Sequence, residues 1–280
     1  MTQLLEVSNL NKSYTKSDFN LSDISLSIAS GEVLGLIGKN GSGKSTLINT
    51  LVGNRFKDSG DIKFFGQSVT ARNNQYKEHI GVVFDDLRVP NKLTLTDIDK
   101  VFTNIYTTWD SNKFKSTLKD FDLPTSNAIK SFSRGMRMKA AIAIALAHDS
   151  QLLILDEATA GMDVSGREEV MEILQDYVAK DYGIMISSHI SEDIETLATK
   201  LVFMRDGKIV LHVDKSHLLS HYGIVNVPLA EFNVSNDYII ASRKRNDRIE
   251  ALIHDRNLVP EAEPLKSIDD ATKIIMRGDK

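Results

Sequence analysis

The sequence predicts an α/β fold with a mostly parallel core sheet, and three observations lead to this prediction. Short apolar runs at Leu152–Leu155, Ile184–Ser187 and Leu201–Met204 alternate with helical segments, which is typical of a parallel sheet covered on both faces. An apolar strand over Glu32–Ile37 leads directly into a glycine-rich loop and then a helix that begins near Lys44. The length of 280 residues allows one large α/β domain and a smaller appendage.

The remaining elements of the N-terminal half follow from local patterns. In Ile24–Ile28 every second residue is apolar, which is the period of a half-buried strand. Helical periodicity runs from Pro90 to about Ala147 and is interrupted at Pro124, and Phe114, Leu118 and Phe121 fall on one helical face of this region. Other strands are expected at Leu4–Val7 and, as a pair, at Asp61–Phe65 and His79–Phe84.

The C-terminal half continues this alternation and then changes character. A helix at about Val164–Ala179 carries an apolar stripe suited to covering a sheet, and Asp206-Gly207 is a hairpin turn between two apolar runs. Residues 213–280 are expected to form a small α+β accessory domain, separate from a main domain at 1–212. Its expected elements are a β-like patch at Tyr238–Ala241 and amphipathic helices near Arg248–His254 and Ile268–Met276.

Composition excludes several classes of function. The 34 basic and 38 acidic residues give a formal net charge of −4, so no nucleic-acid partner is expected. Cysteine is absent, which rules out a disulfide framework and thiolate metal sites. No run approaches the roughly 18 apolar residues that a membrane-spanning helix needs, and the N-terminus lacks the apolar core of a signal peptide.

The segment Gly38–Thr46 (GKNGSGKST) fits the pattern of a phosphate-binding loop. Its glycines allow tight turns that direct backbone N–H groups at phosphate oxygens, and the following helix adds its positive N-terminal end. Lys44 supplies a charge for the β- and γ-phosphates, and the Ser45 hydroxyl is placed to ligate Mg²⁺. An ordinary Gly/Ser-rich turn is the alternative. The candidate nucleotide-binding residues are Gly38, Asn40, Gly41, Ser42, Gly43, Lys44, Ser45 and Thr46.

Two adjacent acids follow the apolar run Leu152–Leu155. Asp156, at the carboxyl end of a parallel strand beside the phosphate loop, can hold Mg²⁺ directly or through water. Glu157 can polarise the attacking water as a general base. Taken alone, two acids after a strand favour helix capping as the interpretation.

The order of these motifs resembles that of an ABC ATPase over residues of about 4 to 212. The resemblance implies a P-loop cassette with an N-terminal antiparallel β subdomain, a helical subdomain at about 87–148, and ATP and Mg²⁺ as cofactors. The matching segments, in chain order, are Gly38–Thr46, Ser131–Met136, Leu152–Glu157, Ala160–Asp163 and Ser187–His189.

The same resemblance implies further site residues. Ser133 and Gly135 match the signature positions that face the γ-phosphate bound by a second subunit, so two chains are needed for each site. His189 is the switch histidine that contacts the γ-phosphate, and Tyr14 stands where an aromatic ring stacks on adenine. A surface histidine and a loop aromatic that covers the sheet edge are the alternatives for these two residues.

The sequence departs from the family pattern at three positions. Arg134 replaces a usual glycine and Met136 a usual glutamine in the signature loop. The strand Ile80–Phe84 leads into Asp85-Asp86, where the family typically has glutamine. Because aspartate can approach Mg²⁺ through a water molecule, Asp85 is a further candidate metal ligand.

The region of Leu95–Leu123, with the single tryptophan Trp109, also resembles single-cassette bacterial exporters of antimicrobial peptides, lantibiotics or phenol-soluble modulins. That implies peptide or antimicrobial export through a separate integral membrane permease, a second ATPase subunit as homo- or heterodimer, and a peripheral location on the cytoplasmic face of the membrane. Alternatives are a ribosome-associated ATPase and a regulator with little hydrolysis. The 133 − 44 = 89 residues between Lys44 and Ser133 contain no heptad array, which disfavours chromosome-type enzymes.

Overall fold

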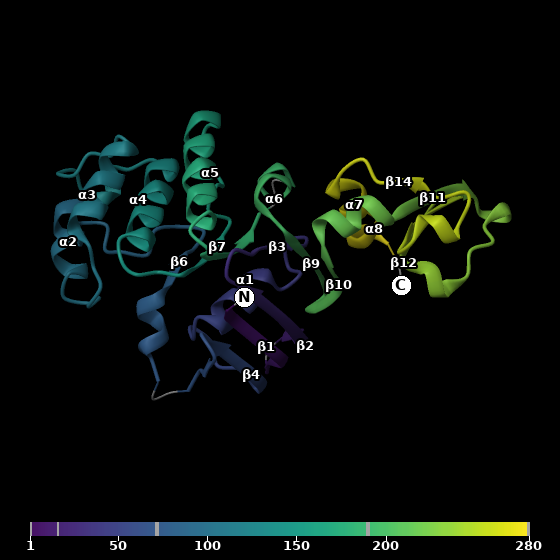
Figure 1. Ribbon diagram of the computed structural model, residues 1–280, viewed down its shortest axis with the longest axis horizontal. Coiled ribbons are helices and arrows are strands. Elements are labelled where there is room, and N and C mark those ends of the chain that lie inside the picture. The colour runs from purple at the N-terminus through teal and green to yellow at the C-terminus, as the bar shows by residue number, and fades with distance from the viewer. Residues whose placement is uncertain (1, 16, 71–72, 189–190, 279–280) are drawn as a thin grey trace.

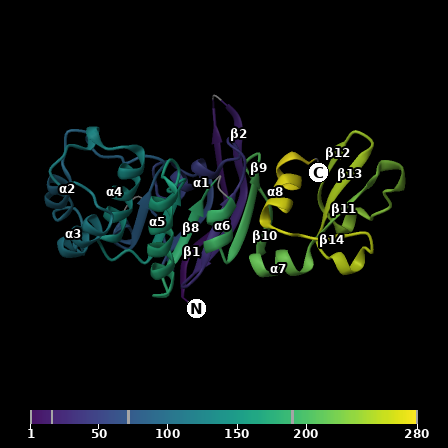
Figure 2. The same ribbon diagram turned by 90° about the horizontal axis from the view of Figure 1, so that it is seen from above.

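The computed structural model describes residues 2–15, 17–70, 73–188 and 191–278. The described chain forms an elongated molecule in which a helical region and a C-terminal sheet lie at opposite ends, with the core sheet between them (Figure 1). Figure 2 shows the same order along the long axis, with helices α2 to α4 at one end and β11 to β14 at the other.

The core sheet has the strand order β10-β9-β3-β8-β7-β6. All neighbouring strands in it run parallel except β9 and β10. Since parallel strands end at the same edge, the loops after β3, β6, β7 and β8 meet there. The strands are β3 Val33–Ile37, β6 Ile80–Val83, β7 Leu152–Asp156, β8 Gly183–Ser187, β9 Lys200–Arg205 and β10 Lys208–Asp214.

A separate N-terminal sheet has the order β2-β1-β4-β5 and is antiparallel. Helix α1, Lys44–Leu51, packs against this sheet and the core sheet in one apolar cluster that includes Leu5, Leu34 and Ile48. The strands are β1 Gln3–Tyr14, β2 Ser17–Ala29, β4 Ser59–Phe64 and β5 Gln67–Ser68.

The predicted pairing of Asp61–Phe65 with His79–Phe84 is wrong. Strand β4 pairs with β1, whereas β6 pairs with β7 in the core sheet. The burial patterns explain the difference: β4 buries only alternate residues, Ile62 and Phe64, as a sheet with one exposed face requires, whereas most of β6 is buried.

The helices cover the other face of the core sheet and build the helical region. Helix α5 buries Val170, Met171, Leu174 and Tyr177, which confirms its predicted apolar stripe, and Phe114, Leu118 and Phe121 are buried together as predicted. The α-helices here are α2 Leu95–Phe102, α3 Ser111–Asp120, α4 Arg134–Leu146, α5 Val164–Val178 and α6 Ser191–Leu197. Short 3₁₀ segments occur at Gln75–His79, Ile129–Ser131, Leu229–Glu231, Asn236–Tyr238 and Arg256–Leu258.

Asp99 of α2 binds side chains from three other positions of the helical region. Its carboxylate accepts hydrogen bonds from Trp109 Nε1 at 2.9 Å and Ser111 Oγ at 2.6 Å, and forms an ion pair with Lys115 at 3.1 Å. Burial alone would raise the pKa of Asp99, but these partners outweigh burial and leave the pKa below its ordinary value. The ionised carboxylate therefore stabilises this region.

Replacing Asp99 by alanine is expected to destabilise the protein by about 2–3 kcal/mol, because Trp109 and Ser111 lose a charged acceptor. Since the pKa of Asp99 is lowered on folding, its contribution is present above pH of about 4 and is lost as the pH falls through the folded pKa. The measurement is urea unfolding followed by the fluorescence of Trp109, at pH 7 and at pH 3. An equal loss of stability at both pH values would contradict this role.

The C-terminal sheet has the order β12-β13-β11-β14, and α8 packs against β12 and β13. Helix α8 confirms the helix predicted at Ile268–Met276, but the helix predicted at Arg248–His254 is wrong, since this segment is the central strand β13. Ala251 and Leu252 of β13 are both fully buried, because each face of the strand is covered. The elements are α7 Lys215–His221, β11 Gly223–Pro228, β12 Ile239–Arg245, β13 Arg248–Ile253, β14 Glu263–Pro264 and α8 Ile268–Arg277.

The predicted hairpin at Asp206-Gly207 is confirmed, and it joins β9 to β10. Both turn residues have positive φ, 49° and 74°, as a type I′ turn requires. Across the described ranges, no helix combines the length and the apolar character needed to span a bilayer.

Candidate nucleotide-binding site

The phosphate loop connects the buried strand β3 to helix α1 at the carboxyl edge of the core sheet. Gly41 and Gly43 have φ of 86° and 109°, a backbone conformation that side chains rarely adopt. Gly43 directly precedes α1, and a Cβ there would lie 2.9 Å from atoms of Leu21 and Phe19. The tight turn therefore requires glycine at position 43. The backbone of Gly43 faces the start of α1.

Lys44, the first residue of α1, is buried inside this loop. Its Nζ donates a hydrogen bond to the Gly38 carbonyl oxygen at 2.7 Å. Burial lowers the pKa of Lys44, while the nearby carboxylates of Glu157 and Asp156 oppose that shift. Within the described part of the chain, the buried Ser42 Oγ has no hydrogen-bond partner. The loop therefore holds a buried cation and a buried hydroxyl, both on residues that the sequence predicts to bind phosphate.

A cavity of about 690 Å³ opens in front of the loop, within the range of small-molecule sites. It brings together most of the residues predicted to bind nucleotide with two of the predicted carboxylates, Asp85 and Glu157. The lining residues are Phe19, Lys39, Asn40, Gly41, Gly43, Lys44, Ser45, Thr46, Asp85, Arg134, Glu157 and Ala160.

The two acids after β7 have different environments. Asp156 is buried, and its Oδ1 accepts a hydrogen bond from Ser187 Oγ of the neighbouring strand at 2.7 Å. Glu157 has φ of 56°, and its N–H donates to the Ser187 carbonyl oxygen at 3.1 Å. A left-handed conformation costs a residue with a side chain about 1–3 kcal/mol. This conformation is compatible with Glu157 lining the cavity.

The donor set at the strand edge suits a hard divalent cation. Ser45 and Asp85 contribute a hydroxyl and a carboxylate to the cavity, and Asp156 lies at the end of the adjacent β7. Such oxygen ligands are the ones that Mg²⁺ prefers, so the residues present fit this ion.

Phe19, rather than the predicted Tyr14, is the aromatic residue that lines the cavity. Tyr14 ends β1, and its ring lies under two cations, Lys12 at 5.3 Å and Arg55 at 5.5 Å. Phe19 lies on β2, and its ring edge approaches Gly43. A phenylalanine five residues before the predicted strand Ile24–Ile28 gives no local signal of a ligand contact, so sequence reasoning missed it.

Ser133 and Gly135 do not line the cavity in front of the phosphate loop of their own chain. Ser133 caps α4, its Oγ accepting a hydrogen bond from Met136 N at 3.2 Å. With Gly135 it lines a second cavity of about 350 Å³ bordered by Gly161 and Asp163. Arg134 lines both cavities.

Helix α4 is also tied to the loop that follows β6. Arg137 donates two hydrogen bonds of 2.8 Å to the Asp86 carboxylate, one from Nε and one from Nη2. Such bidentate pairs fix geometry as well as charge. The pair joins residues 51 positions apart, so the sequence offered no signal for it.

The switch-histidine candidate, His189, lies outside the described residues, but the chain before and after the gap at 189–190 is described. Asp193 of α6 is completely buried and accepts hydrogen bonds from Thr159 Oγ1 and Ser188 Oγ. Arg167 of α5 pairs with the same carboxylate. The end of β8 is thereby connected to the segment that follows Glu157.

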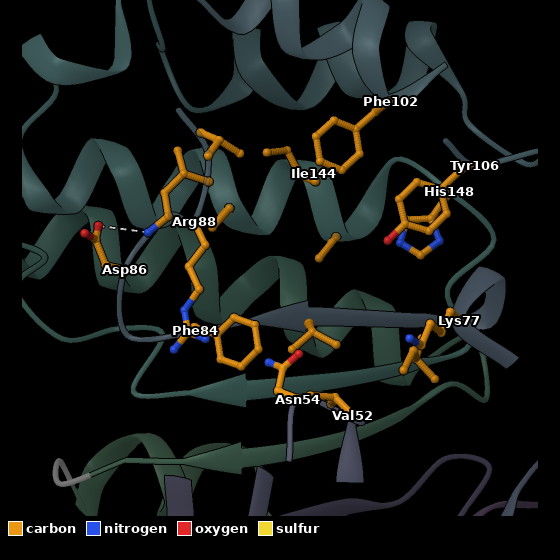
Figure 3. Close-up of a pocket in the computed structure, with 16 residues that line it drawn as sticks. Val52, Asn54, Lys77, Phe84, Asp86, Arg88, Phe102, Tyr106, Ile144 and His148 are labelled. Carbon is orange, nitrogen blue, oxygen red and sulfur yellow. Dashed lines mark hydrogen bonds between the residues drawn. The ribbon is translucent and has the colours of Figure 1, made fainter. Parts of the chain in front are cut away.

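A groove of about 290 Å³ lies on the helical side, between the end of β6 and helices α2 and α4. Phe102 and Ile144 point into it, and the rings of Tyr106 and His148 stack with centroids 4.1 Å apart (Figure 3). Burial lowers the pKa of His148, which favours the neutral form of its ring. Arg88 lies over the Phe84 ring at the groove edge.

Comparisons with known proteins agree with this geometry. Residues 21–160 match the family model described as ABC transporter. The lantibiotic transport ATP-binding protein SrtF of Streptococcus pyogenes is 36% identical over 74% of this chain and 90% of its own length. The linearmycin resistance ATP-binding protein LnrL of Bacillus subtilis is 27% identical over 91% of this chain and 84% of its own.

A solved structure of an ATP-binding subunit of an ABC transporter is also similar, with a TM-score of 0.71 and 26% identity over 77% of this chain and 91% of that one. The family match and the 36% identity to SrtF agree with the motifs and the fold described above. The chain therefore belongs to the ABC transporter family and is an ATP-binding, ATP-hydrolysing subunit of that family.

Proposed function

We propose that this chain powers the export of peptides or antimicrobial compounds through a separate integral membrane permease. The observation that carries the proposal is the single cavity that holds Lys44, Ser45, Asp85 and Glu157 together. The names of SrtF and LnrL, a lantibiotic transport protein and a linearmycin resistance protein, support the class of cargo. The location would be peripheral, on the cytoplasmic face of the membrane.

The active assembly would contain two ATPase subunits. Each ATP would lie between Lys44 of one chain and Ser133 and Gly135 of the other, because these groups line different cavities in one chain. The Lys44 ammonium and the N-terminus of the partner's α4 would neutralise phosphate charge, so that ATP stabilises the closed dimer. Hydrolysis and release of phosphate would reopen it.

Each candidate residue would have a defined part in hydrolysis. Ser45, Asp156 and Asp85 would hold Mg²⁺, which supplies charge neutralisation at the phosphates when bound. Glu157 would accept the proton of the attacking water, and His189 would orient that water. Residues 1–212 would form the nucleotide-binding domain, and residues 213–280 an accessory domain.

The overall proposal is tested by locating the chain in fractionated cells and measuring its turnover. A transporter subunit should sediment with membranes together with one integral membrane protein, and the purified chain should bind ATP in a magnesium-dependent manner. Sedimentation with ribosomes would favour the ribosome-associated alternative, and ATP binding without turnover would favour a regulator.

We expect the permease to bind at the apolar groove beside Ile144. Replacing Ile144 by glutamate places a charge in this groove, and burying an unpaired carboxylate costs several kcal/mol, so co-purification of the permease should fall more than tenfold. Ile105→Glu is the matched control, because Ile105 is 58% exposed and does not line the groove. Equal co-purification of both variants, with ATP binding intact, would place the permease contact elsewhere.

A further inference from the structure

An arginine at the end of β9 binds the end of helix α8 to the core sheet. Arg205, the last residue of β9, donates hydrogen bonds from Nη1 to the carbonyl oxygens of Ile275 at 2.8 Å and Gly278 at 2.6 Å. Carbonyl groups in the last turn of a helix have no partner within the helix, and a cation there is favourable. Arg205 thus connects the C-terminal sheet to the core sheet.

The residues that follow β9 hold the phosphate loop. The Gly207 N–H donates a hydrogen bond to the Ser42 carbonyl oxygen at 3.0 Å. The backbone of Gly38 passes so close to β9 that a Cβ there would lie 2.7 Å from the Met204 carbonyl oxygen. Arg205 therefore stands between two residues that contact the loop, Met204 and Gly207.

A polar cavity of about 490 Å³ separates the crest of the phosphate loop from the end of α8. Its lining includes three cations, Lys39 from the loop, Arg205 from β9 and Arg277 from α8, and the acid Asp206. The C-terminal helix thus faces the nucleotide-binding loop across this cavity, although the two are more than 230 residues apart in sequence (277 − 39 = 238).

The opposite end of α8 contacts helix α6. The Ile268 N–H donates a hydrogen bond to Glu195 Oε1 at 2.8 Å, and the Ser191 hydroxyl bonds to Asp269. Helix α6 also carries the buried Asp193, which binds Thr159 close to Glu157 in the chain. One end of α8 therefore contacts β9 beside the phosphate loop, and the other contacts α6, which is hydrogen-bonded to the segment that follows Glu157.

We propose that α8 braces the nucleotide site, so that the position of the C-terminal sheet sets the affinity for ATP. Arg205 is the positioning residue on the phosphate-loop side, and Glu195 is its counterpart on the side of Glu157. This inference rests on the proposed function, since it assumes that the loop binds ATP. A movement of the C-terminal sheet would be transmitted through α8 to the phosphate loop. Such a movement would regulate the affinity for ATP.

The test is Arg205→Ala in the full chain, with the affinity for Mg-ATP and the steady-state constants measured. The dissociation constant and KM for ATP should rise about tenfold, within the usual range of coupling between sites, while kcat stays within about twofold. Arg205→Lys retains a cation that can reach a helix-end carbonyl, so it should restore most of the affinity. Arg248→Ala is the matched control, because Arg248 also donates to a backbone carbonyl, that of Asn226, within the C-terminal sheet.

Glu195→Ala tests the other end independently of Arg205. It should lower kcat severalfold and leave ATP affinity unchanged, whereas Glu195→Gln keeps the Oε1 acceptor and should behave like the original protein. If the original protein fails to bind ATP, the proposed function is wrong. If it binds ATP but both alanine variants match it in affinity and turnover, the bracing role of α8 is overturned.

Discussion

Glu157→Gln is expected to lower ATP turnover by about 10²–10⁴-fold, the usual contribution of a general base, and to leave ATP binding intact. Glu157 lines the cavity beside Lys44 and has a left-handed backbone. Glutamine has the same size and can keep this backbone, but its amide cannot take a proton from water. ATP should therefore stay bound between the two chains, and the closed dimer should accumulate.

Two measurements check this outcome: phosphate release under saturating Mg-ATP, and molecular mass in solution with and without Mg-ATP. Glu172→Gln is the matched control, since Glu172 is exposed on α5 away from the cavity lined by Glu157. The control should hydrolyse ATP normally and show no ATP-dependent dimer trapping. Hydrolysis by Glu157→Gln at the rate of the control would exclude Glu157 as the base.

The core sheet and the phosphate loop could be predicted because their signals are local. The segment Val33–Leu51 contains an apolar strand, then glycines, then a helix. The apolar run Leu152–Asp156 indicates a buried strand and ends in a carboxylate. The parallel arrangement then places both segments at one edge, so the meeting of Lys44 and Glu157 in one cavity follows from topology.

Strand partners and short buried strands could not be predicted in the same way. Nothing within Ile80–Val83 tells it to pair with β7, which lies about 70 residues away, instead of the nearer β4. The run Arg248–Ile253 ends in three successive apolar residues because both faces of β13 are covered there, and periodicity alone cannot separate such a strand from a buried helix.

Within the site, the missed contacts depend on packing between distant segments. Phe19 reaches the cavity only because β2 lies against the phosphate loop, and Arg137 pairs with Asp86 only because α4 lies beside the end of β6. The contact between Arg205 and the end of α8 is of the same kind. Sequence motifs thus locate chemical groups, whereas tertiary contacts decide how those groups are held.

Lys44→Met is expected to weaken Mg-ATP binding by about tenfold to hundredfold, because a charged hydrogen-bond donor to phosphate is lost. The same change should leave the thermal unfolding temperature unchanged or raise it. Burial lowers the pKa of Lys44, so the folded protein disfavours the ammonium at pH 7 relative to the unfolded chain, and removing the charge relieves that cost. Loss of binding without loss of stability distinguishes a ligand contact from a structural one.

Titration calorimetry with Mg-ATP and a thermal scan of the same sample check both halves of this expectation. Lys119→Met is the control, since Lys119 is exposed on α3 and lies outside the cavity. The glycine-rich turn holds the Lys44 ammonium against the Gly38 carbonyl oxygen, at the wall of the candidate nucleotide cavity. A Lys44→Met variant that binds ATP as tightly as Lys119→Met would therefore mean that the phosphates bind elsewhere, and the roles assigned to Ser45, Asp156 and Glu157 would lose their basis.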